Sequence, residues 1–187
     1  MSMFCYQCEQ TAKGEGCTNF GVCGKDPETA ALQDLLVHAT KGIANYAHRA
    51  RQLGAADSGI DRFTSDALFT TVTNVNFDPA RMEQELRRAA AVKDQASALY
   101  EEACRQQGQS PEGLNGYTSW TPAADLNGLI RQGEEVGIEK RVGRLGPDRA
   151  GLQELLTYGL KGTAAYAHHA EVLGYEDEEV HAFFQEA

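Results

Sequence analysis

The chain has 187 residues and a formal net charge of −10, with 42% hydrophobic and 24% charged residues. This composition is ordinary for a globular protein of one domain or two small ones, and the acidic excess argues against a nucleic-acid-binding protein. Because no stretch approaches the roughly 18 consecutive apolar residues of a membrane span and the start lacks signal-peptide character, we expect a cytoplasmic protein without a membrane partner.

Residues 1–26 are rich in cysteine and glycine and show no hydrophobic period. Four of the five cysteines of the chain lie here, at Cys5, Cys8, Cys17 and Cys23. In a reducing compartment such a cluster indicates metal ligands and not a disulfide framework. Four thiolates suit one iron–sulfur cluster, and they also suit a structural zinc ion. Zinc sites favour paired Cys-x2-Cys motifs, which only the first pair has, so the spacing favours iron and leaves zinc open.

Helical signals begin directly after this segment. Asp26 can cap a helix and Pro27 fits its first position, and apolar residues then recur at spacings of three and four up to Gly54. A second helix is predicted from Asp61 into the early 70s. A third is predicted across residues 78–108, again from an Asp-Pro start. Together these helices predict a three-helix bundle.

The stretch from residue 108 to residue 121 carries Gly, Pro, Ser and Asn without a period, and it is the predicted boundary between two units. Thr121-Pro122 repeats the pattern of a cap followed by proline, which predicts a helix through about Val136. A glycine-rich connection is expected from there to Pro147.

The sequence repeats itself with a shift of 120 residues. The matching segments LQDLL and LQELL, KG and KG, YAH and YAH, and LG and LG begin at Leu32 and Leu152, Lys41 and Lys161, Tyr46 and Tyr166, and Leu53 and Leu173. Asp34 and Glu154 are among the matched positions. Gly42 and Gly162 lie mid-helix, where glycine costs about 1 kcal/mol relative to alanine, so we expect both to permit close helix contact.

We therefore predict an all-α fold with two related three-helix-bundle units after a cysteine-rich, cluster-binding segment at residues 1–26. The first unit covers residues 27–108 and the second covers residues 109–187. The second unit is expected to be incomplete, because Ala187 is the counterpart of a position partway along the second helix of the first unit.

The motifs FCYQCEQTAKGEGC, GVCGK and LQELLTYGLKGTAAYAHHAEVLG closely resemble the N-terminal helical domain of hybrid cluster proteins, also called prismane proteins. The resemblance runs from Met3 to the last residue. Within that family the x2, x8, x5 cysteine spacing is similar to the class that carries a 4Fe–4S cubane. The resemblance thus implies that the four N-terminal cysteines hold a 4Fe–4S cluster.

The resemblance also implies an oxidoreductase that reduces hydroxylamine to ammonia and water, and in some members nitric oxide. The N-terminal cluster would pass electrons inward from an electron-donor redox protein. Catalysis in the family occurs at a hybrid iron–sulfur–oxygen cluster whose ligands lie beyond residue 187, so no catalytic residue and no turnover are expected for this chain alone. The alternative is a zinc-stapled helical interaction module without redox activity.

Five further residues invite a functional interpretation. Lys13 and Lys25 could raise the cluster potential, although a solvated surface charge is the ordinary role of an isolated lysine. Cys104 is expected to be a small buried thiol, since a fifth ligand would exceed what one cluster needs. His48 and His168 occupy equivalent repeat positions, which predicts a shared packing or hydrogen-bonding role.

Overall fold

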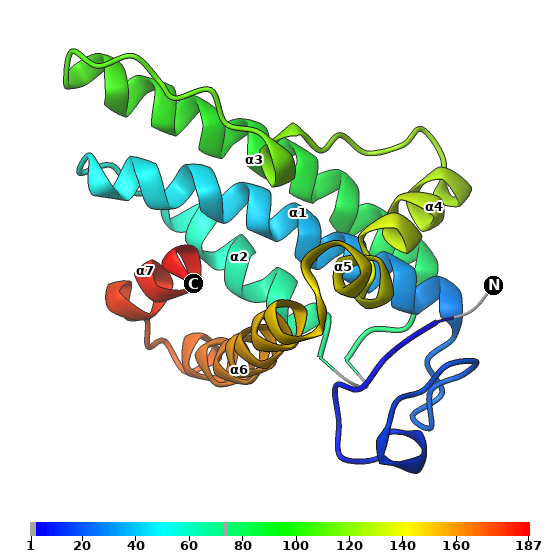
Figure 1. Cartoon of the computed structure of the whole chain (residues 1–187). Helices are drawn as coiled ribbons and strands as arrows, with labels where there is room; N and C mark the ends of the chain where they lie inside the picture. The colour runs from blue at the N-terminus through cyan, green and yellow to red at the C-terminus, as the bar shows by residue number, and fades with distance from the viewer. Residues whose placement is uncertain (1–2, 73–74) are drawn as a thin grey trace.

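The structure is a computed structural model that describes residues 3–72 and 75–187. Over these residues the chain consists of helices and loops, and no β-strand is present. The cysteine-rich segment forms a loop beside the start of the first long helix (Figure 1). The predicted all-α class is therefore confirmed, and none of the described helices is long and apolar enough to span a bilayer.

The first three long helices lie close to their predicted positions: α1 (Pro27–Gln52), α2 (Ser58–Thr70) and α3 (Pro79–Gln106). The predicted cap of α1 is present, because the Asp26 carboxylate accepts a hydrogen bond from the Thr29 backbone N–H at 2.7 Å. Helix α2 begins three residues earlier than Asp61. The reason is Asp57, whose carboxylate accepts hydrogen bonds from the backbone N–H groups at the start of α2.

The middle of the chain differs more from prediction. A short 3-10 helix, η2 (Gly116–Ser119), precedes α4 (Leu126–Val136) and α5 (Ile138–Leu145). Helix α4 does not begin at Thr121-Pro122, because Asp125 is the residue whose carboxylate accepts from the Gly128 N–H, at 2.7 Å. The expected glycine-rich connection is itself the helix α5.

The second copy of the repeat forms α6 (Pro147–Val172) and α7 (Glu178–Glu186). It reproduces the first copy in detail: Leu53 and Leu173 both follow the last helical residue. Asp57 and Asp177 cap the next helix with the same backbone angles, φ −137° and ψ 119°. The duplicated sequence therefore folds into duplicated local structure.

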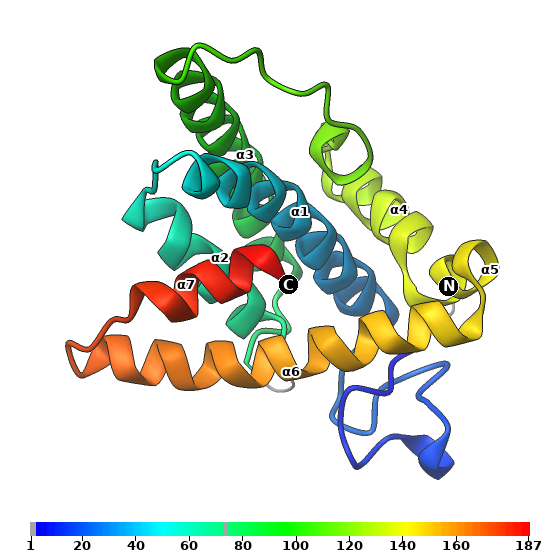
Figure 2. The same cartoon turned by 60° about the vertical axis from the view of Figure 1, so that its left-hand side comes forward.

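The main core joins the helices α1 to α4. Its fully buried side chains include Leu32, Leu35, Ile43, Phe63, Met82, Leu86 and Leu129. A smaller core forms where α6 and α7 meet α2, around Leu68, Leu160 and Phe184. Figure 2 shows α6 running past one end of α1, with α7 lying against α1. The division into units 27–108 and 109–187 remains a prediction, because these helices contact one another across it.

Candidate metal centre

The cysteine loop is closed by a pair of backbone hydrogen bonds between two of its cysteines. The N–H of Cys5 donates to the carbonyl of Cys17 at 3.0 Å, and the N–H of Cys17 donates back at 2.8 Å. The Thr11 hydroxyl also donates to the carbonyl of Cys5, at 3.0 Å. Cys17 is buried, whereas Cys8 and Cys23 are half-buried, so the loop holds one of these thiols inside and the other two nearer to solvent.

The thiols at the closed end of the loop are in different electrostatic settings. Backbone N–H groups of Val22 and Ala12 point at the Cys17 sulfur and lower its pKa, and the Ala12 nitrogen lies 3.4 Å from that sulfur. Burial raises the pKa of Cys5, and the positive charge of Lys25 opposes this rise. Hydrogen-bond donors of this kind are the contacts that tune thiolate-bound iron.

Lys25 is not the solvated surface charge that an isolated lysine suggests. Its residue is only 2% exposed, and its ammonium lies 5.7 Å from the centroid of the Phe77 ring. The local reason is a turn, because the carbonyl of Lys25 accepts from the Gly21 N–H at 2.8 Å and draws the backbone inward. Lys13, in contrast, is exposed as expected. Lys25 therefore remains a candidate for tuning a cluster, and Lys13 is a surface charge.

Glycine is required where the loop turns around its last cysteine. A Cβ added at Gly21 would lie 3.0 Å from the Cys23 sulfur and 3.1 Å from the Cβ of Lys25. Gly24, the next residue after that cysteine, has φ +92°, a value that residues with side chains rarely adopt. The loop thus fits closely around the position of Cys23.

Four free thiols in one loop are a donor set of the number and kind that an iron–sulfur cluster takes, and the sulfurs are not gathered as closely as a single zinc ion requires. All five cysteines lie in the described part of the chain and all are free thiols. Four thiolates about 2.3 Å from one zinc ion would lie roughly 3.8 Å apart in a tetrahedron. Among residues 3–72 and 75–187, no three cysteine sulfurs lie within 4.8 Å of one another. Cys104 is 2% exposed and packs away from the loop, beside Ala50 and Tyr100, which confirms its expected role.

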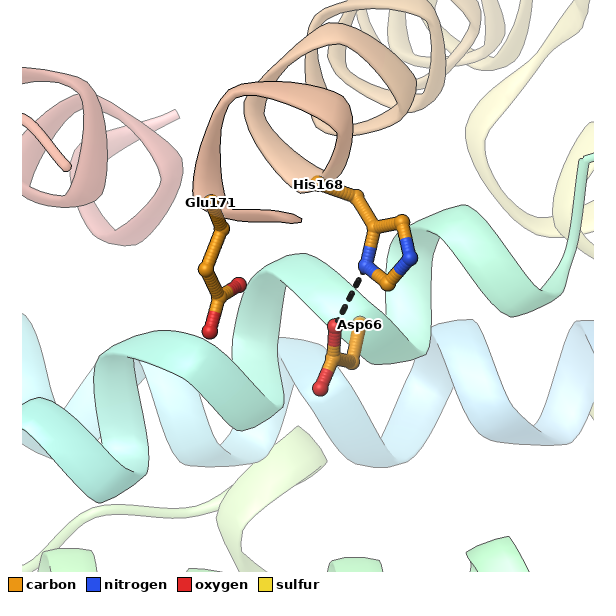
Figure 3. A group of neighbouring side chains, drawn as sticks. All are labelled: Asp66, His168 and Glu171. Carbon is orange, nitrogen blue, oxygen red and sulfur yellow. Dashed lines mark hydrogen bonds and ion pairs between the residues drawn. The ribbon is translucent and has the colours of Figure 1, made fainter. Parts of the chain in front are cut away.

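The two repeat-related histidines lie away from the cysteines and have different partners. His48 contacts the side chain of Gln52, one turn along its own helix, at 2.9 Å. His168 on α6 contacts Asp66 on α2 at 3.2 Å (Figure 3). Both histidines thus form a hydrogen bond, as expected, but the role is not shared, because His48 bonds within its own helix and His168 bonds to another. Figure 3 also shows Glu171. One carboxylate oxygen of Glu171, one of Asp66 and one ring nitrogen of His168 lie within 4.8 Å of one another, so the three residues are possible metal ligands by geometry.

Side chains of this trio join α2 to α6 by a hydrogen bond and an ion pair. Besides the contact of His168 with Asp66, the Glu171 carboxylate lies 3.3 Å from the Arg62 guanidinium. The His168 ring also stacks on Phe69, with 4.6 Å between the ring centroids. These contacts hold the two repeats together, and they account for the carboxylates without a metal ion.

A polar cavity lies where α1 and α6 face each other. Asp34 and Lys41 line it from α1, and their counterparts in the repeat, Glu154 and Lys161, line it from α6. Arg141 of α5 adds a third cation and forms an ion pair with Glu154. Burial raises the pKa of Asp34 to about 6 and lowers that of Lys161 to about 8. None of these residues was predicted as part of a site, although the matched Asp/Glu and Lys/Lys pairs in the repeat were the available signal.

Residues 3–187 match the Prismane/CO dehydrogenase family. A protein named hydroxylamine reductase from Rhodospirillum rubrum is 55% identical over 184 residues, which are 98% of this chain and 34% of that protein. Proteins of the same name from Geobacter sulfurreducens and Methanocella arvoryzae are 52% and 49% identical, and the matches cover 100% and 97% of this chain. The chain spans about a third of the length of these curated relatives.

Proposed function

Since this chain belongs to the Prismane/CO dehydrogenase family, we propose that it is the N-terminal electron-transfer portion of a hydroxylamine reductase. Proteins of this family bind iron–sulfur clusters. We propose that residues 1–26 hold one such cluster, of the 4Fe–4S type, and that the helices of units 27–108 and 109–187 carry and orient it. The single observation that carries the proposal is one closed loop with four free cysteines.

Each part of the loop has a role in this proposal. Cys5, Cys8, Cys17 and Cys23 are the four ligands, and a cluster bound by them supplies one-electron transfer. The N–H groups directed at Cys17 favour its thiolate form, which is the form that binds metal. The buried ammonium of Lys25 offsets negative charge gathered on the thiolates.

The proposed activity of the whole protein is the reduction of hydroxylamine to ammonia and water. A redox protein would donate the electrons in the cytoplasm, and neither nucleic acid nor a membrane takes part. The four proposed ligands account for every cysteine of the chain except Cys104, so no second set of thiolates is left for a catalytic cluster. We therefore expect the 187-residue chain to show no hydroxylamine turnover, although it carries the electron-transfer centre.

Iron and acid-labile sulfide, measured on anaerobically purified protein together with its absorption near 400 nm, test the proposal. We expect about four iron and four sulfide per chain for a single cubane. Cys17→Ser is expected to lose most of both, whereas the matched control Cys104→Ser replaces a buried thiol outside the loop and is expected to keep them. One zinc per chain with negligible iron and sulfide would refute the redox function and favour the zinc-stapled module.

A further inference from the structure

Lys161 lies almost fully buried between the two repeats, at 5% exposure. Its ammonium donates a hydrogen bond at 3.0 Å to the side-chain oxygen of Gln7, which is a neutral amide. Within the described part of the chain, no carboxylate oxygen lies within 4.0 Å of this ammonium. Asp34 and Glu154 line the same cavity but form no ion pair with this ammonium, and because a buried cation without a direct partner is costly, a further anion nearby would stabilise it.

Gln7 places this charge beside the cysteine loop. It stands between Cys5 and Cys8, and its backbone N–H is directed at the Cys5 sulfur. A contact from Lys161 to Gln7 therefore reaches the first pair of proposed ligands.

The repeat provides an internal comparison. Lys41 is the counterpart of Lys161 on α1 and lines the same polar cavity. The Lys41 ammonium lies 5.5 Å from the centroid of the Tyr117 ring, whereas the Lys161 ammonium donates to Gln7 of the cysteine loop. The two lysines of the repeat therefore have different partners, and the lysine of the second copy is the one that forms a hydrogen bond to the loop.

We propose that Lys161 is the counter-charge of the iron–sulfur cluster and, through Gln7, a positioning residue for its loop. This inference rests on the proposed function. Four thiolates give a bound cluster net negative charge that increases on reduction, and a fixed positive charge nearby stabilises the reduced form. Lys161 therefore raises the reduction potential, and α6 contributes to the electron carrier although it supplies no ligand.

The test is a redox titration of the anaerobic, iron-loaded chain followed by electron paramagnetic resonance. Lys161→Met is expected to lower the equilibrium constant for reduction about tenfold, which is a shift of about 59 mV to more negative potential for a one-electron couple. Lys161→Arg keeps the charge and is expected to stay near the wild-type potential. Lys41→Met, the matched control, is expected to leave the potential unchanged. The series is repeated with Asp34→Asn, so that uptake of a proton by Asp34 cannot mask the lost charge.

An intact cluster with an unmoved potential in Lys161→Met overturns the inference and leaves the proposed function standing. Equal shifts in Lys161→Met and Lys41→Met also overturn it, because the whole cavity would then act as one field. If Lys161→Met assembles no cluster, the potential of Lys161→Arg tests the inference instead. A wild-type potential in Lys161→Arg supports the role of charge, and loss of the cluster there as well refutes it. A wild-type chain without iron and sulfide overturns the proposed function and this inference together.

Discussion

Replacing Gly42 and Gly162 with alanine is expected to change stability in opposite directions, although the two glycines match in the repeat. A Cβ at Gly42 would lie 2.6 Å from the carbonyl oxygen of Tyr117 in η2. A Cβ at Gly162 meets no atom within 4 Å, so the expected close helix contact exists at Gly42 and is absent at Gly162. One substitution adds a clash, and the other adds only helix propensity.

The magnitudes follow from these contacts. Alanine in place of an exposed helical glycine stabilises by about 1 kcal/mol, which applies to Gly162→Ala. Gly42→Ala gains the same about 1 kcal/mol but loses about 1–3 kcal/mol to overpacking. The neighbouring backbone cannot retreat freely, because the Lys93 ammonium holds the carbonyls of Thr118 and Trp120 at 3.1 and 2.6 Å. The two variants should therefore differ by about 1–3 kcal/mol.

Thermal unfolding of the iron-loaded chain, followed by circular dichroism at a helical wavelength, measures this difference. For a chain of this length about 1 kcal/mol corresponds to roughly 2–4 °C, so we expect Gly162→Ala to melt roughly 2–12 °C above Gly42→Ala. Wild-type protein should lie between them or level with Gly42→Ala. Equal shifts of the same sign in both variants would refute the inference that η2 packs directly on α1 at Gly42.

Three further changes test other parts of the structure. The pKa of His38 is lowered to about 4 by burial and nearby cations, so the unfolded chain binds the proton first and stability falls as the pH drops from about 6.5 to about 4. The urea midpoint of the wild type should therefore fall between pH 7 and pH 5, and that of His38→Gln should fall much less. Gly21→Ala, with its Cβ 3.0 Å from the Cys23 sulfur, should lower the iron and sulfide content per chain. Arg51→Met removes two hydrogen bonds of 2.8 Å from the Asp61 carboxylate and should lower the free energy of unfolding by about 2 kcal/mol.

Each of these expectations has a contrary result. An identical loss on acidification in wild type and His38→Gln would place the titrating group elsewhere. Gly113→Ala, at a loop glycine with no atom within 4 Å of an added Cβ, is the control for Gly21→Ala, and equal iron content in both would show that the loop tolerates the methyl group. Unchanged stability in Arg51→Met would mean that the carboxylate of Asp61 is satisfied by its other partner, Gln185.

Local chemistry made much of the fold predictable. The caps at Asp26 and Asp78 and the apolar period that follows each depend on residues a few positions apart, so the bounds of α1 and α3 could be read from the sequence. The start of α4 could not, because Thr121-Pro122 and Asp125 are both acceptable starts and only the folded chain selects Asp125. Helix α5 was missed because it has only eight residues and follows Gly137, which provides no side-chain cap that would mark a helix start.

The proposed ligands were predictable, but their surroundings were not. Residue type and spacing were enough to propose four ligands, Cys5, Cys8, Cys17 and Cys23. The burial of Lys25 depends on a turn and on the Phe77 ring, 52 positions further along the chain. The polar cavity depends on how α1 and α6 meet. The residue pattern of one helix does not predict which other helix it will face. The matched lysines of the repeat were nevertheless a sign of where the cavity lies.

The hydrogen bond from Lys161 to Gln7 spans 154 positions, and this separation sets a schedule for biosynthesis. At about 5–20 residues per second, a ribosome makes the second of these residues roughly 8–30 seconds after the first. During that interval the nascent amino-terminal thiols are already outside or leaving the exit tunnel without their partner from α6. The cysteines are thus synthesised first, but the side chains that surround them in the folded chain are complete only after α6 has been made.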